Sequence, residues 1–124
     1  MMNQAVAYDM HDRSENVDPV RLTIMAYDGV INDLRQAKKH WLDQAEDNVI
    51  QKNQHAQDII TELLLGLDYE QGGEIARNLS KLYDFALRQL VSIGRESDVL
   101  MYDHLINIFN DLRGAWAQIS MQKY

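Results

Sequence analysis

The sequence predicts an all-α protein, an antiparallel up-down four-helix bundle preceded by a flexible N-terminal arm. Apolar residues recur at spacings of three and four along four successive segments, which is the period of a helix with one buried face. No segment alternates apolar and polar residues as a half-buried strand would. Because the connections between these long segments are short, we expect neighbouring helices to run antiparallel.

The N-terminal residues 1–17 are polar and lack helical periodicity, so they are expected to form a mobile arm. The bundle domain is expected over residues 18–124. Its first helix should begin at Asp18 and Pro19, because aspartate is a good N-cap and proline fits the first helical position, where its missing N–H costs nothing.

The boundaries of the later helices are predicted from capping residues. Asp47 and Asn48 are expected to end the first helix and cap the second, and Gly94 to cap the end of the third. Residues 68–73 should connect the second helix to the third. The glycine pair Gly72-Gly73 in this connector resembles a phosphate-binding loop only superficially, since acidic residues precede it and no lysine or hydroxyl partner follows. We therefore interpret the pair as a tight turn.

The composition excludes several classes of function. The formal net charge of the 124 residues is -7, so the chain should repel phosphate backbones and anionic lipids, and we expect no nucleic-acid or membrane partner. No cysteine is present, which excludes disulfides and thiolate chemistry. The first residues have neither a basic nor an apolar region of a signal peptide, so a cytoplasmic location is expected.

Motifs for catalysis or metal binding are missing. No glutamate is followed three residues later by a histidine, as a di-iron bundle requires, and no two histidines stand four apart, as a helical zinc pair requires. We therefore expect no enzyme, no catalytic residue, no metal and no cofactor. One alternative is a histidine phosphotransfer bundle that uses His40 in "KKHW"; another is a structural homodimer in which surplus apolar rows cover each other.

Three stretches carry a resemblance to a known family. They are "DPVRLTIMAYDGVINDLRQAKK" (18–39), "LDYEQGGEIARNLSKLYDFALRQL" (67–90) and "LRGAWAQI" (112–119). In this order they resemble the flagellin export chaperone family, FliS, over nearly the whole chain. The chain departs from the family pattern at Asp18, where serine is usual, and at Phe85, where tyrosine is common.

The resemblance implies a cytoplasmic, non-enzymatic chaperone. Its partner would be the C-terminal segment of flagellin, which is disordered in the monomer and would be held in apolar grooves of the bundle. Binding would prevent premature polymerisation and assist flagellar type III secretion. Components of the export apparatus or a co-chaperone are further implied partners.

The family pattern also suggests where flagellin would bind. Tyr8 is the arm's one aromatic residue and would pack on the bundle or take part in cargo binding; Asn78 would either bond the flagellin backbone or tie down the connector before it. Tyr27 lies on the core stripe, which favours burial with a hydrogen-bonded hydroxyl over cargo contact. A row of apolar residues on the third helix would form either part of the core or the wall of a groove; it consists of Leu79, Leu82, Tyr83 and Leu87. The full set of candidates is Tyr8, Tyr27, Asn78, Leu79, Leu82, Tyr83 and Leu87.

Overall fold

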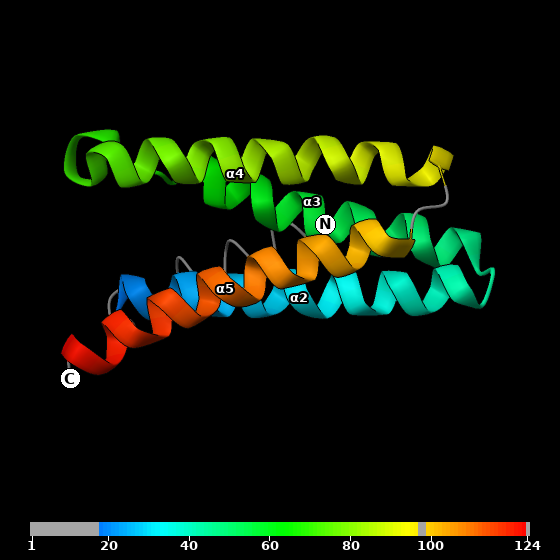
Figure 1. Cartoon of the computed structure of the whole chain (residues 1–124), viewed down its shortest axis with the longest axis horizontal. Coiled ribbons are helices and arrows are strands. Elements are labelled where there is room, and N and C mark those ends of the chain that lie inside the picture. Colours follow the sequence, from blue (N-terminus) through cyan, green and yellow to red (C-terminus); the bar gives the residue numbers. More distant parts are fainter. Residues whose placement is uncertain (1–17, 97–98, 124) are drawn as a thin grey trace.

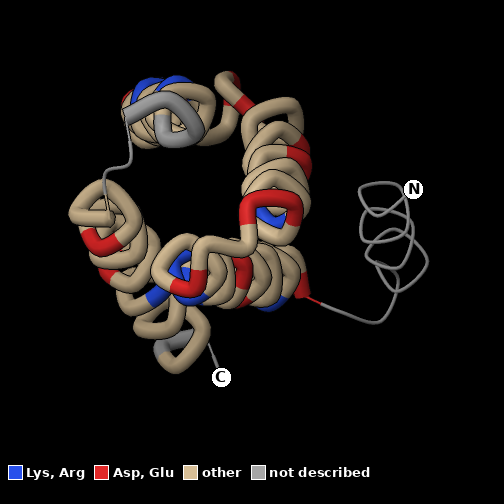
Figure 2. Tube along the Cα trace, turned by 90° about the vertical axis from the view of Figure 1, so that its right-hand side faces the viewer, with Lys and Arg blue, Asp and Glu red and all other residues tan. Residues whose placement is uncertain are grey.

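The computed structural model describes residues 18–96 and 99–123, which form four α-helices. These are α2 (Pro19–Leu42), α3 (Glu46–Leu65), α4 (Tyr69–Glu96) and α5 (Val99–Lys123). Figure 1 shows each helix running back along the one before it, and Figure 2 shows the four grouped around one long axis. The predicted all-α fold and antiparallel four-helix bundle are confirmed. The predicted arm, residues 1–17, lies outside the described residues, and the division into arm and bundle stays a prediction.

The first helix begins as predicted, but it ends earlier in the sequence than predicted. The Asp18 carboxylate accepts a hydrogen bond of 2.8 Å from the backbone N–H of Val20, and Pro19 follows as the first helical residue. The helix ends at Leu42, because Gln44 adopts a positive φ of 60°, and α3 starts at Glu46. Asp47 therefore lies in the first turn of α3, where its carboxylate is favoured by the free N–H groups of the helix terminus.

The connector around the glycine pair is shorter than predicted. It ends at Asp68, whose carboxylate accepts hydrogen bonds from the backbone N–H groups of Glu70 and Gln71, so that α4 already starts at Tyr69. The tight turn itself is confirmed, since Gly73 has non-helical angles of φ 51° and ψ -122° and kinks α4. A Cβ on Gly72 would come within 2.9 Å of the Ala76 side chain. The two glycines are thus needed for different reasons, one for its backbone angles and one for space.

The end of α4 also differs from the prediction. The helix continues past Gly94 to Glu96, so the glycine does not cap it. A glycine inside a helix costs about 1 kcal/mol relative to alanine, which weakens a helix without having to end it.

The core draws on all four helices. Its largest fully buried side chains are those of Tyr27, Tyr83, Tyr102, Phe109, Leu34, Ile60, Leu90, Leu105 and Val30. Helix α2 packs closely against α3 and α5, whereas α4 rests mainly on α3 and hardly touches α5. Within the described ranges, no helix has the length and apolar character that a membrane span requires.

Polar side chains join the helices at defined points. The Tyr102 hydroxyl donates to the side-chain oxygen of Asn53 over 2.8 Å and so joins α5 to α3. The Lys38 ammonium donates to Asp103 over 2.6 Å and joins α2 to α5. The hydroxyls of Tyr27 and Tyr83, 2.6 Å apart, join α2 to α4. A hydrogen bond between two buried tyrosines therefore links α4 to α2.

The kink in α4 leads to a prediction about stability. Gly73→Ala should lower the free energy of unfolding by about 1–3 kcal/mol, because a side chain disfavours these backbone angles. Gly114→Ala is the control: this glycine lies within α5 with open space around its Cβ position, so alanine should raise the free energy by about 0.5–1 kcal/mol. Urea denaturation of both variants measures the effect, and a neutral or stabilising Gly73→Ala would contradict the role given to the kink.

Candidate functional site

An apolar groove opens at the end of the bundle where α2 begins, α3 ends and α4 begins. It encloses about 460 Å³ and is called the α2–α4 groove below. This is the end at which the first turns of α2 and α4 lie in Figure 1. Its lining consists of Pro19, Val20 and Thr23 from α2, Glu62 and Leu63 from α3, Gly66, Leu67 and Asp68 from the connector, Gln71, Gly72, Ile75, Ala76, Leu79 and Tyr83 from α4, and Trp116 from α5.

Aromatic side chains form the bottom of this groove. Tyr83 and Trp116 line it, and Tyr27 lies beneath them with its ring centroid 6.5 Å from that of Tyr83 and 6.4 Å from that of Trp116. Burial raises the pKa of Tyr27, an effect partly offset by hydrogen bonds with Tyr83 and Trp116. Burial and the neighbouring Tyr27 also raise the pKa of Tyr83. Both phenols therefore keep their protons at neutral pH.

The upper wall and the rim differ in character from the bottom. Ile75, on the first full turn after the α4 kink, is 68% exposed although it lines the groove. Leu63 and Leu67 are half-buried, and the exposed Glu62 and Asp68 add carboxylates to the rim. An apolar channel with a polar rim suits the apolar face of an amphipathic peptide segment.

The structure places the predicted flagellin-binding residues in different surroundings. Leu79 and Tyr83 line the groove, and Tyr27 is fully buried with a hydrogen-bonded hydroxyl, as predicted. Asn78 is exposed on α4, while Leu82 and Leu87 are half-buried and outside the lining. Tyr8 lies outside the described residues.

Sequence reasoning did not identify Ile75 as a groove residue. It stands on the same apolar stripe as Leu79, which is buried, so the spacing alone gave both residues the same role. A usable signal was its place directly after the glycine pair, where α4 begins at the end of the bundle and has fewer neighbours.

A second groove lies at the opposite end, at the turn between α2 and α3. It encloses about 530 Å³ and is lined by Trp41, Gln44, Ala45, Glu46, Val49, Ile50 and Asn53. None of the predicted flagellin-binding residues that lie in the described part of the chain contributes to it. The α2–α4 groove is therefore the candidate site.

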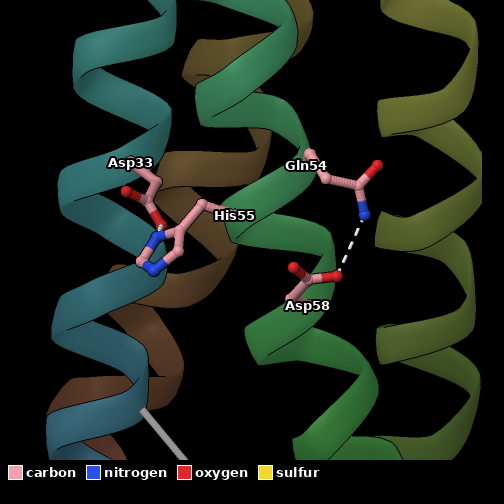
Figure 3. A network of polar contacts seen from close by, with 4 residues as sticks. All are labelled: Asp33, Gln54, His55 and Asp58. Carbon is pink, nitrogen blue, oxygen red and sulfur yellow. Dashed lines mark hydrogen bonds and ion pairs between the residues drawn. The ribbon is translucent and has the colours of Figure 1, made fainter. Parts of the chain in front are cut away.

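A buried polar contact lies between α2 and α3, away from both groove linings. Figure 3 shows Asp33 of α2 and His55 of α3 pointing toward each other, while Gln54 and Asp58 form a separate contact of 2.9 Å along α3. Asp33 is 2% exposed, and this burial raises its pKa, an effect partly offset by His55 and Lys52. In the described part of the chain, no three His, Cys, Asp or Glu side chains gather as metal ligands would.

Comparison with known proteins gives one family. The model of the flagellar protein FliS matches residues 1–123. The flagellar secretion chaperone FliS of Salmonella typhimurium is 35% identical over 109 residues, which are 85% of this chain and 78% of the relative. That of Campylobacter jejuni is 27% identical over 120 residues, 95% of this chain and 94% of the relative. The match to FliS of Vibrio cholerae, 42% identical over 64 residues, covers 52% of this chain and 47% of that relative, about half of its length.

The buried carboxyl of Asp33 predicts a pH dependence. A raised pKa means that the folded state favours the protonated form, so the contribution of Asp33 to stability is present below about pH 4 and is lost as the pH rises through the folded-state pKa. The free energy of unfolding of the unmodified protein, relative to Asp33→Asn, should therefore fall as the pH rises from about 4, the ordinary pKa of an aspartate, through the raised pKa of Asp33. Denaturant titrations of both proteins across this range measure the difference, and a difference that stays flat or rises with pH would contradict the assignment.

Proposed function

The chain belongs to the family of the flagellar protein FliS, and from this premise we propose that it is a cytoplasmic, non-enzymatic chaperone that binds the C-terminal segment of flagellin for export. Binding covers the segment and so prevents premature polymerisation, and it assists delivery to the flagellar type III secretion apparatus. Export components or a co-chaperone remain predicted partners.

The observation that supports this proposal is the α2–α4 groove, an apolar channel at the surface of the bundle that two of the predicted residues, Leu79 and Tyr83, line. Fully burying an aliphatic side chain such as Ile75 contributes about 1.5–3 kcal/mol, so a segment that covers the channel gains substantial binding energy. Ordering a disordered segment opposes this gain and keeps the affinity moderate. A cargo that has to be released for export suits such an affinity.

The exposed side of α4 continues from the groove and gives the segment a path. Asn78 is three residues beyond Ile75, and Leu82 is four residues beyond Asn78, so the three side chains follow one another on one side of the helix. We propose that a segment leaving the groove crosses them, with the Asn78 amide bonding its backbone. Tyr8 and Leu87 stay predicted contacts without a place in this path.

The alternatives have less support. His40 is half-buried in the last turn of α2, next to the exposed Lys39, and the family assignment favours a chaperone over a phosphotransfer protein. The homodimer stays a prediction, because family membership does not determine the oligomeric state.

Calorimetry with a flagellin C-terminal peptide tests the proposed function. We expect binding at concentrations of about tens of micromolar or below, with a negative heat-capacity change from the burial of apolar surface. A titration without heat and without a heat-capacity change would contradict it.

A pair of matched variants tests the place of binding. Ile75→Ser should weaken peptide binding by roughly tenfold or more, because an apolar contact of about 1.5 kcal/mol or more is lost. Val91→Ser is the control, since Val91 is 56% exposed on the same helix but lies outside the groove lining. Both replacements are at exposed positions, so the thermal midpoints should change little. Equal weakening by both variants would place the binding surface elsewhere.

A further inference from the structure

The groove at the turn between α2 and α3 has no role in the proposed function. It encloses about 530 Å³ and is called the α2–α3 groove below. This volume falls within the range of about 300–1,000 Å³ that is usual for binding sites in proteins. The groove lies at the opposite end of the bundle from the α2–α4 groove, and Figure 2 looks onto that end.

Apolar side chains of both helices are accessible at this groove. Trp41, in the last turn of α2, is half-buried in the lining. Ile50 lines the groove from α3 and is 58% exposed, and Leu42, which follows Trp41 in the chain, is 63% exposed. Tryptophan is enriched at the centres of protein–protein contacts, where it contributes much of the binding energy. The surface therefore offers apolar contact area to a protein partner.

The charge at this groove is negative. Glu46 is the charged residue of its lining, and the exposed Asp43 and Asp47 stand close to Glu46 in the chain. None of these three carboxylates forms an ion pair with another described residue. The nearest lysines on either side in the sequence, Lys39 and Lys52, lie outside the lining. An occupant of the groove therefore meets carboxylates that are free to pair with it.

These charges favour one kind of occupant. Anionic lipid headgroups would be repelled by the carboxylates. A second copy of the chain would bring its own carboxylates against the same patch, because a two-fold contact places identical surfaces together. A protein segment that carries lysine or arginine beside an apolar face gains both attraction and apolar burial.

We propose that the α2–α3 groove docks a basic amphipathic segment of a second partner protein, separate from flagellin. The apolar face of this segment packs on Trp41 and Ile50, and its cationic side chains lie against Glu46 and the neighbouring carboxylates. The two grooves share no lining residue and lie at opposite ends of the bundle. The protein can therefore hold this partner while a cargo occupies the α2–α4 groove.

The two tryptophans of the chain allow the two grooves to be observed separately. Trp41 lines the α2–α3 groove and Trp116 lines the α2–α4 groove, so the fluorescence of Trp116→Phe comes from Trp41. The probes are two synthetic amphipathic peptides with the same apolar face and with either lysine or glutamate at the polar positions. The lysine peptide should shift the Trp41 emission to shorter wavelength and bind at least about tenfold more tightly than the glutamate peptide at low salt. High salt should reduce this difference.

Calorimetry on matched variants that keep both tryptophans tests the place of binding. Ile50→Ser should weaken binding of the lysine peptide roughly tenfold, because an apolar contact of the α2–α3 groove is lost. Ile75→Ser is the control: Ile75 is 68% exposed and lines the other groove, so its variant should bind the lysine peptide within about twofold of the unmodified protein.

Several outcomes would overturn the inference. They are equal binding of the two peptides, an effect of Ile75→Ser as large as that of Ile50→Ser, and a dimer that Ile50→Ser dissociates. Weakening of flagellin-peptide binding by Ile50→Ser would assign the groove to the cargo and would overturn the inference as well. A flagellin peptide that fails to bind the unmodified protein would contradict the proposed function and leave this inference in place.

Discussion

The attachment of α4 to the rest of the bundle is the constraint on which the candidate site depends. Helix α2 is enclosed by α3 and α5, whereas α4 rests on α3 and hardly touches α5. The contact between Tyr27 and Tyr83 reaches from α2 to α4 through the core, beside Trp116 of α5. These rings hold α4 against the core, while its first turns lie apart from α5. An apolar channel therefore remains open between the helix ends.

The helices and the start of the bundle could be predicted from the sequence, because long periodic segments and a good cap are local features. Tyr27 could be assigned to the core for the same reason. The end of α2 could not be predicted from the sequence, since an aspartate such as Asp47 suits both a cap and the first turn of a helix. The prediction that Gly94 caps the end of the third helix was wrong because a glycine permits a helix to end without requiring it.

The candidate site was predictable only in part, for a tertiary reason. Leu79 and Ile75 have the same spacing and the same apolar character, yet one is buried and the other is largely exposed. The difference arises from where the first turns of α4 lie relative to α2 and α3, which no local pattern encodes. The paired polar residues Asp33 and His55 were missed as well, because the apolar period counts a polar residue at a core-facing position as an interruption.

The shape of the groove and the chemistry of its surface depend on different residues, and the kink at Gly73 determines the shape. The direction in which α4 leaves the connector follows from the angles of one glycine and from the Asp68 carboxylate that holds the preceding turn. The partly exposed side chains of the wall, such as Ile75, contribute little to that direction. Such side chains can therefore be exchanged to fit the channel to a different peptide while the backbone that frames it stays in place.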